Sequence, residues 1–470
     1  MIFSTVEFFL FFSIVLPAAV LLRESRWLHP FLLIASFYFY MSWNAWFILL
    51  LIPAIALDYY VAPKMAASTS LKQKRRWLMV SLVGNLGLLG FFKYTNFTID
   101  TINAFLPVIF QLSALDITLP IGISFHTFQT LSYTIDVFLG RVAVERSFIK
   151  LALFVSFFPQ LVAGPIVRAQ EFLPQLYHRI DFDLGRIKEG IERFVVGLVK
   201  KLLIADALAP YVDRVYTNPF HHDAPTLWLA TFAFGIQIYC DFSGYSDMAI
   251  GTAKCLGYRF PENFNMPYFA ANIRDFWQRW HISLSSWLRD YLYIPMGGSR
   301  GRELAVLRNL MATMLLGGLW HGASWKFVIW GGLHGCYLIA YRLWWQYKKN
   351  RGWQSNELYR PAFAVLSTII TFLVVHLAWV YFRASDALTA TTMIGRMMTW
   401  NLHGEFVGSP LLFIGATVLF IGHVIATCAD PELLYRKVPL PFKVVGYAMI
   451  FYLISISSIQ ENTPFIYFQF

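Results

Sequence analysis

Two histidines stand in strongly apolar sequence, and each follows a tryptophan directly. His281 follows Trp280, and His321 follows Trp320 a further 40 residues along the chain. A neutral imidazole, with a pKa near about 6.5, accepts a proton from a hydroxyl at physiological pH. An imidazole in lipid-facing sequence is costly unless it is paired or faces a wet cavity. We therefore predict that both histidines are catalytic, with His321 as a base at membrane depth and His281 either sharing the chemistry or orienting the acceptor.

The chemistry that such a base favours is acyl transfer to a hydroxyl. A deprotonated oxygen attacks an acyl carbon, and thioesters are the usual activated donors. The one Gly-x-Ser-x-Gly match, at residues 297–301, lies in a basic loop and not at the strand-to-helix elbow that a nucleophilic serine needs. Direct transfer is therefore favoured over a serine acyl-enzyme, and an acyl-imidazole intermediate stays open. The alternative is that both histidines are structural, which is how we interpret His126, His334 and His376.

No metal or bound cofactor is expected. The four cysteines show no close C-x-x-C pairing, and we interpret them as buried apolar residues: Cys240, Cys255, Cys336 and Cys428. The chain also lacks a P-loop, a dinucleotide-binding glycine motif and an H-E-x-x-H motif.

A polar group interrupts the apolar stretch 228–256. It contains Asp241, Ser243, Tyr245 and Asp247, which are difficult to interpret as lipid-facing. On one straight helix the two carboxylates point to different faces, so a helix break at Ser243 is an alternative. These residues form either the polar wall of a channel or a hydrogen-bonded helix junction.

Glycines and lysines inside other apolar runs give one expectation about helix packing and one about the location of charged side chains. Gly317 and Gly318, just before His321, allow neighbouring backbone to approach closely. Lys200 and Lys201 interrupt the apolar stretch 194–208. Their side chains either snorkel to the membrane interface or face a polar cavity, and snorkelling is the simpler expectation.

Residues 272–293 combine three tryptophans with several charges, which suits an amphipathic helix at the membrane interface. At helical spacing, one face carries Trp277, Trp280 (or His281), Leu284 and Leu288, and another carries Arg274, Gln278, Ser285 and Arg289. The basic, glycine-rich loop 295–302 follows. Its Arg300 and Arg302 either hold a donor phosphate or anchor the loop on the cytoplasmic side.

Composition places this machinery in a membrane. Of the 470 residues 57% are hydrophobic and 14% are charged, against roughly a quarter charged in soluble domains. The net charge of +11 comes from short basic clusters between apolar runs, so we expect the lipid bilayer, and no nucleic acid, as a partner. We predict one all-α polytopic domain over residues 1–470, with about 10–12 transmembrane or re-entrant helices.

Longer motifs resemble a known family. Residues 275–293 (DFWQRWHISLSSWLRDYLY), 315–323 (LLGGLWHGA) and 239–251 are similar to signatures of the membrane-bound O-acyltransferase family. The match is closest to its bacterial branch of alginate and exopolysaccharide O-acetyltransferases. Residues 120–125 and 379–384 extend the similarity to nearly the whole chain.

The resemblance implies a fold of tilted helices around a central funnel or channel, with His321 at the near-universal family histidine and His281 at the second. It implies acetyl transfer from a cytoplasmic donor, acetyl-CoA, across the bacterial inner membrane. It also implies periplasmic serine-esterase-like (SGNH) partners and polysaccharide synthesis machinery. His126, where an aromatic is expected, and a shorter C-terminal region leave alginate, cellulose or another glycan as the acceptor.

Two other functions remain alternatives. One is transfer of D-alanine or another acyl group to a cell-envelope polymer such as teichoic acid. The other, from a different class, is a proton-coupled transporter in which the intramembrane carboxylates and histidines form an ion path.

Overall fold

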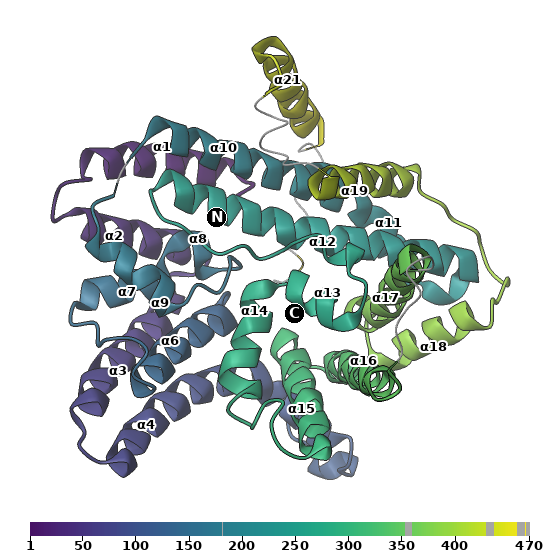
Figure 1. Cartoon of the computed structure of the whole chain (residues 1–470), viewed down its shortest axis with the longest axis horizontal. Coiled ribbons are helices and arrows are strands. Elements are labelled where there is room, and N and C mark those ends of the chain that lie inside the picture. The colour runs from purple at the N-terminus through teal and green to yellow at the C-terminus, as the bar shows by residue number, and fades with distance from the viewer. Residues whose placement is uncertain (181, 353–359, 429–436, 458–465, 467–470) are drawn as a thin grey trace. The chain divides into compact units, whose positions relative to one another are not determined.

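The computed structural model describes residues 1–180, 182–352, 360–428, 437–457 and 466 (Figure 1). The chain folds as two compact units. The first comprises residues 1–196 and 245–262, and the second comprises residues 197–244 and 263–470. The described residues form helices and connecting loops, which confirms the predicted all-α class.

The first unit contains the helices of the N-terminal half. They are α1 (Val6–Leu21), α2 (Leu28–Met41), η1 (Ala45–Phe47), α3 (Ile48–Ala67), α4 (Leu71–Leu89), the π-turn η2 (Gly90–Tyr94), α5 (Thr95–Asn103), η3 (Val108–Phe110), α6 (Ile123–Phe138), α7 (Phe148–Ser156), α8 (Phe158–Leu161), α9 (Ala169–Phe172), η4 (Leu173–Tyr177) and most of α10 (Leu184–Val199).

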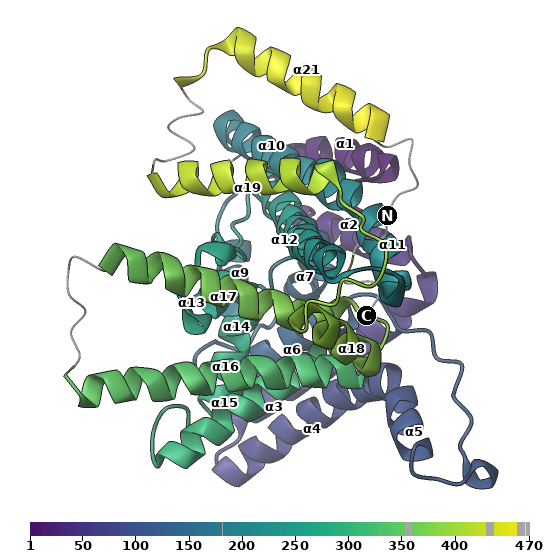
Figure 2. The same cartoon turned by 90° about the vertical axis from the view of Figure 1, so that its right-hand side faces the viewer.

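A buried polar cluster joins α3, α4 and α6, which pack against one another (Figures 1 and 2). Asp58 on α3 accepts hydrogen bonds from Ser81 Oγ at 2.5 Å and from Asn85 Nδ2 at 3.2 Å, both on α4. Thr130 Oγ1 on α6 donates to Asn85 Oδ1 at 3.2 Å. Because apolar contact alone does not favour helix association in lipid, these interhelical hydrogen bonds help to specify the packing.

The second unit contains the remaining helices. They are the π-turn η5 (Lys200–Ala205), α11 (Asp206–Thr217), η6 (Pro219–His221), the unit's part of α12 (Ala224–Cys255), η7 (Pro267–Phe269), α13 (Ile273–Arg279), α14 (Ile282–Leu288), the π-turn η8 (Arg289–Tyr293), α15 (Glu303–His321), α16 (Trp325–Asn350), α17 (Arg360–Arg383), α18 (Ala387–Met398), α19 (Pro410–Cys428) and α21 (Leu440–Ser457).

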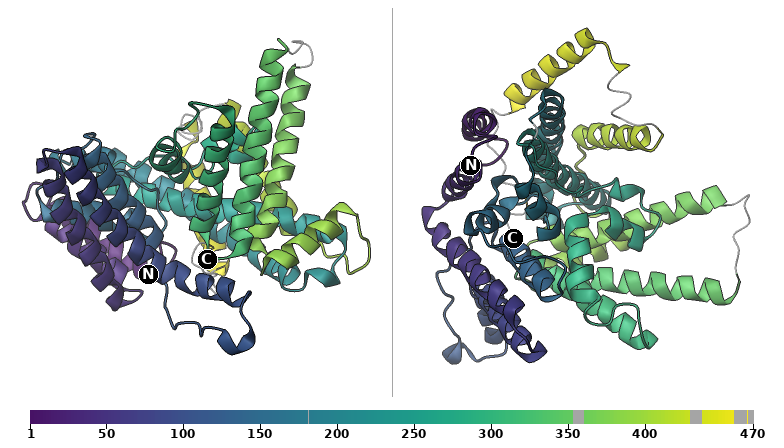
Figure 3. Two further views of the ribbon diagram at one scale, coloured as in Figure 1. Left: turned by 90° about the horizontal axis from the view of Figure 1, so that it is seen from below. Right: turned by 60° about the vertical axis from the view of Figure 1, so that its left-hand side comes forward.

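Helices α15 and α16 form a tight hairpin (Figures 1 and 2). Gly318 on α15 faces Gly331 on α16, and a Cβ atom at Gly331 would overlap the carbonyl oxygen of Met314. The close backbone approach expected from the glycines before His321 is therefore confirmed at Gly318. Helix α17 lies along the other side of α16, as the two long green helices in the left panel of Figure 3 show.

Three described helices are long and apolar enough to cross a membrane: Ala45–Ala67, Leu71–Asn103 and Pro361–Arg383. Four further apolar helices are shorter: Val6–Leu21, Leu28–Met41, Pro410–Ile425 and Leu440–Ile456. These helices suit a polytopic membrane protein, whereas the number of 10–12 crossings stays a prediction.

Two local predictions are wrong. Helix α12 continues through Ser243 without a break, because Gly244 serves a close packing contact: a Cβ there would lie 2.7 Å from the Gly197 carbonyl oxygen. The segment 272–293 is not one helix either. It consists of α13 and α14, separated by an extended Trp280 and by His281 in the left-handed region at φ 43°.

Candidate active site

His321 is the last residue of α15 and lies in an aromatic cage. The residue is 4% exposed. Its ring centroid lies 5.0 Å from Trp320, 5.0 Å from Trp330 and 5.4 Å from Phe382. The helix ends here because Gly322 adopts extended backbone at φ −163°, which turns the chain towards α16. The hairpin thus supplies Trp330, and α17 supplies Phe382, to fix the orientation of this imidazole.

His281 lies at the junction of α13 and α14 and is fully buried. Its φ and ψ of 43° and 56° are uncommon for a residue with a side chain, although histidine is enriched there several-fold. The imidazole packs edge-on against Phe242 at 4.6 Å, and its Nδ1 lies 3.1 Å from Asn263 Oδ1. Backbone outliers of this kind cluster at functional sites, where the surrounding structure holds them.

One indole connects the two histidines. The ring of Trp320 lies 6.1 Å from His281 and 5.0 Å from His321 between centroids. The two imidazole centroids are therefore no further apart than about 11 Å, the sum of these distances. Residues 40 positions apart in the sequence are brought to a common aromatic cluster, as the prediction of a joint site requires.

Trp280, the residue before His281, belongs to the same aromatic cluster. It is fully buried, stacks on Phe276 at 5.7 Å and contacts Trp379 at 5.0 Å. Trp379 also stacks on Trp330, which contacts His321. The indoles of Trp280, Trp379 and Trp330 form a continuous apolar wall, and Trp320 contacts both histidines, so the surroundings of the two imidazoles are largely dry.

A pocket of about 530 Å³ opens beside both histidine-bearing segments. Ile282, the residue after His281, lines it, and so does Met314, which lies two turns before His321, or about 10 Å along α15. Its wall also contains the four polar residues assigned from the sequence to one face: Arg274, Gln278, Ser285 and Arg289. Trp277 and Leu288, which the sequence pattern assigns to the other face, line the pocket as well, and the helix is broken, so the pocket does not confirm the two-face assignment.

The arginines at the pocket differ in their partners. Arg289 pairs with Asp290, with Nε and Oδ1 2.6 Å apart. Arg342 pairs with Glu303 through two hydrogen bonds of 2.6 and 3.0 Å, and these bonds, with one from Gln346, hold the pKa of Glu303 at about 2. Within the described residues, no carboxylate pairs with Arg274, so its guanidinium is available to an anionic ligand.

Arg300 and Arg302 lie outside the pocket wall. Both are exposed, and Ser299 is the residue of their loop that lines the pocket. The loop turns at three glycines with positive φ: Gly297 at 111°, Gly298 at 57° and Gly301 at 93°. Binding of a donor phosphate by the two arginines stays a prediction.

Asp241 takes part in a buried ion-pair cluster of the second unit. Lys201 Nζ lies 2.8 Å from Asp241 Oδ1 and 2.7 Å from Asp206 Oδ1, and the backbone N–H of Ile466 donates to Asp241 Oδ2 at 2.8 Å. The expectation that Lys201 snorkels to the interface is therefore wrong, because two carboxylates compensate the burial of its ammonium group. Ser243 is buried on the same part of α12.

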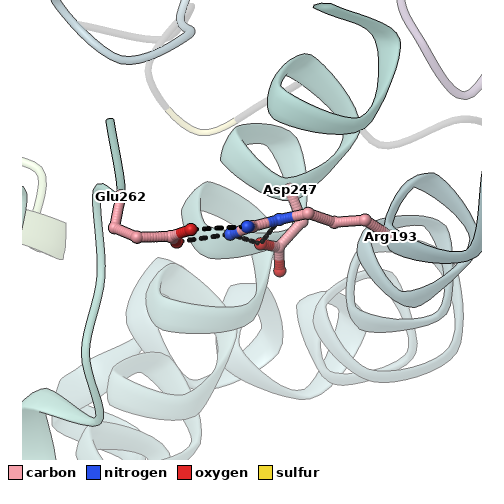
Figure 4. Close-up of polar contacts among 3 residues, drawn as sticks. All are labelled: Arg193, Asp247 and Glu262. Atoms are coloured by element: carbon pink, nitrogen blue, oxygen red, sulfur yellow. Dashed lines mark hydrogen bonds and ion pairs between the residues drawn. The ribbon is translucent and has the colours of Figure 1, made fainter. Parts of the chain in front are cut away.

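Tyr245 and Asp247 belong to the first unit. The Tyr245 ring contacts Phe3 at 4.8 Å. Asp247 accepts hydrogen bonds from Arg193 Nε and Nη2 at 3.1 and 2.9 Å, and the same guanidinium binds Glu262 (Figure 4). These contacts are hydrogen bonds and ion pairs from an unbroken α12 to other segments of the same unit, and a role of the four residues in lining a channel stays a prediction.

The sequence interpretation missed several contributors. Asn263 orients His281 from 18 positions upstream, and Trp330 and Phe382 surround His321. No local spacing indicates such partners. The one available signal was the aromatic content of the segments 325–344 and 379–384.

The fold and site define the class: an all-α polytopic membrane protein with two buried histidines beside an arginine-lined pocket. The sequence model of the membrane-bound O-acyltransferase family matches residues 39–382, which cover most of the chain. The chain belongs to this family and is an O-acyltransferase.

Three relatives show how the family varies. A probable alginate O-acetylase of Azotobacter vinelandii is 41% identical over 85% of this chain and 78% of its own length. A peptidoglycan O-acetyltransferase of Helicobacter pylori is 38% identical over 79% of this chain and 73% of its own. A teichoic acid D-alanyltransferase of Bacillus subtilis is 28% identical over 54% and 65%.

Proposed function

We propose that this chain transfers an acetyl group from a cytoplasmic thioester, acetyl-CoA, for O-acetylation of an extracellular polysaccharide. The observation that carries the proposal is the common aromatic cluster of His281 and His321, whose two segments also contribute Ile282 and Met314 to a pocket with an available arginine. The relatives support an acetyl group over D-alanine, because the two named for O-acetylation are 38–41% identical and the D-alanyltransferase is 28% identical.

In the proposed reaction, His321 accepts the proton of a hydroxyl as its oxygen attacks the thioester carbonyl carbon. The C–S bond then breaks, the thiolate leaves, and the imidazolium returns the proton to the sulfur. His281 contacts the same Trp320 ring and either stabilises the carbonyl oxygen or orients the incoming hydroxyl. The dry indole wall strengthens both interactions because it lowers the local dielectric constant.

The pocket suits the donor. Its wall combines apolar side chains such as Leu288 and Met314 with hydroxyls from Ser285, Tyr293 and Tyr341. Such a surface binds a pantetheine arm through its methylene groups and amides. Arg274 supplies a cationic group for a phosphate at the mouth, a role in which guanidinium is favoured.

The proposed acceptor determines where the protein acts and which partners it needs. We propose a location in the bacterial inner membrane, with periplasmic serine-esterase-like partners that hand the acetyl group to alginate, cellulose, peptidoglycan or a similar glycan. The names of the relatives support a polymer of the cell envelope or matrix as the final acceptor.

Replacing Arg274 with glutamate is expected to raise the KM for acetyl-CoA about 10- to 100-fold, because a charge-assisted hydrogen bond is worth about 1.5–3 kcal/mol. Initial rates of thiol release from proteoliposomes measure the change. The matched control is a substrate: acetyl-N-acetylcysteamine has no phosphate, so its KM is expected to be the same for both proteins. An equal loss with both thioesters would contradict phosphate binding by Arg274.

The function itself is tested with the purified protein in liposomes. With acetyl-CoA outside the liposomes, and the periplasmic partner and a polysaccharide acceptor inside, we expect release of free CoA and formation of O-acetyl esters. A proton-coupled transporter would instead move substrate or protons without consuming a thioester. A D-alanyltransferase would use only D-alanine attached to a carrier protein, so the thioester that supports ester formation separates the three functions.

A further inference from the structure

Asn263 lies in the irregular segment between α12 and η7, and its side chain, 1% exposed, is a convergence point for hydrogen bonds. Its Oδ1 accepts from Ser283 Oγ at 2.8 Å and from the Ser283 backbone N–H at 3.2 Å. It lies 3.1 Å from His281 Nδ1. Its backbone carbonyl accepts from the Ile282 N–H at 2.9 Å, so the segment is fastened to the α13–α14 junction at several points.

These contacts determine which ring nitrogen of His281 carries the proton. A backbone N–H only donates, so the Asn263 atom that it meets is the amide oxygen and not the amide nitrogen. An oxygen of this kind only accepts, so His281 Nδ1 must be the donor. In a neutral imidazole the second nitrogen, Nε2, then keeps its lone pair and can act as a base or hydrogen-bond acceptor.

The backbone of His281 adds to this constraint. The residue lies in the left-handed region, which is unfavourable for residues other than glycine and is maintained here by the surrounding structure. Asn265 N–H donates to the Arg279 carbonyl at 2.9 Å, which fixes the approach to the turn from the other side. The left-handed backbone of His281 sets the direction of its Cα–Cβ bond, and the contact with Asn263 sets the rotation and the tautomer of the ring.

We propose that Asn263 is a positioning residue for acyl transfer: it holds His281 as the Nδ1–H tautomer and leaves Nε2 as the nitrogen with the lone pair. The inference rests on the proposed function, because it assigns Asn263 a role only through His281. Any side chain at position 263 that offers a carboxamide or carboxylate oxygen to the Nδ1–H of His281 can hold this tautomer. A side chain of equal size without an acceptor oxygen cannot.

The test compares three variants of the full chain in proteoliposomes, with thiol release from acetyl-CoA as the readout. Asn263→Leu keeps the size but removes the acceptor, and its kcat is expected to fall about 100-fold with little change in the KM for acetyl-CoA. Asn263→Asp keeps an acceptor oxygen and is expected to stay within about tenfold of the wild-type kcat. Ser283→Ala removes a different donor to the same oxygen and is expected to cost less than about threefold.

Folding is checked for each variant by size-exclusion chromatography and by the melting temperature in detergent. A parallel fall of kcat in the leucine and aspartate variants would overturn the positioning role, and so would an unchanged kcat in Asn263→Leu. A His281→Gln variant separates this failure from that of the proposed function. If His281→Gln is fully active, the proposed role of His281 is wrong. If it is impaired but Asn263→Leu is not, only the inference about Asn263 is wrong.

Discussion

Replacing His321 with alanine is expected to lower the rate of acetyl transfer by about 10²–10⁴-fold, the usual contribution of a general base. The aromatic rings that surround His321, those of Trp320, Trp330 and Phe382, cannot accept a proton in its place. The measurements are thiol release by the purified variant and the acetyl-ester content of the extracellular polymer in cells that carry it.

A matched control separates chemistry from packing. His376 is another fully buried imidazole of the second unit, with its Nδ1 2.8 Å from the Phe372 carbonyl oxygen and its ring against Phe232. His376→Ala leaves a cavity of the same size, so both variants lose similar stability, roughly 2–5 kcal/mol. Only His321→Ala should lose the acyl-transfer step. Normal acetylation by a well-expressed His321→Ala protein would exclude His321 as the base.

The sequence predicted the helical class and most helices because apolar runs of membrane length have few alternative structures. It failed where the fold departs from a regular helix. The break at Trp280 and His281 falls inside a segment whose hydrophobic periodicity predicts one helix. The contact that stabilises His281 at the break comes from Asn263, 18 residues earlier in the chain, where no local pattern indicates it. Conversely, the Ser243-Gly244 sequence suggested a break in the helix, but α12 is intact there. The glycine is needed because a Cβ at position 244 would lie too close to the carbonyl oxygen of Gly197.

The candidate site also combines features that the sequence predicted with features that it could not predict. Helical spacing placed Arg274, Gln278, Ser285 and Arg289 together, and all four line the pocket. Trp277 and Leu288, predicted on the other face, line it too, because the segment is two helices and not one. The pairing of Lys201 with Asp241 was not predictable, because a lysine in apolar sequence snorkels or is neutralised according to partners that only the fold supplies. Charge compensation, unlike periodicity, is a property of tertiary structure.

The glycines of the α15–α16 hairpin show how packing reaches the chemistry. Gly331 on α16 faces Gly318, three residues before His321, and a Cβ at Gly331 would overlap the Met314 carbonyl oxygen. Backbone atoms cannot rotate away as a side chain does, so the two helices would have to separate. Trp330, the residue before Gly331, contacts His321 at 5.0 Å, and separation would therefore disturb the aromatic cage.

Gly331→Ala is accordingly expected to destabilise the protein by about 3 kcal/mol, the upper part of the usual range for overpacking, and to lower kcat at least about tenfold in the folded fraction. Gly332→Ala is the matched control one position away. Its new Cβ would meet only Leu315 Cδ2 at 3.5 Å, an ordinary van der Waals contact, so near wild-type stability and activity are expected. Melting temperature in detergent and thiol release measure the two effects. Equal behaviour of the two variants would mean that close approach of α15 and α16 does not set the position of His321. A stable but inactive Gly331→Ala protein would show that the hairpin tolerates separation while the orientation of the imidazole does not.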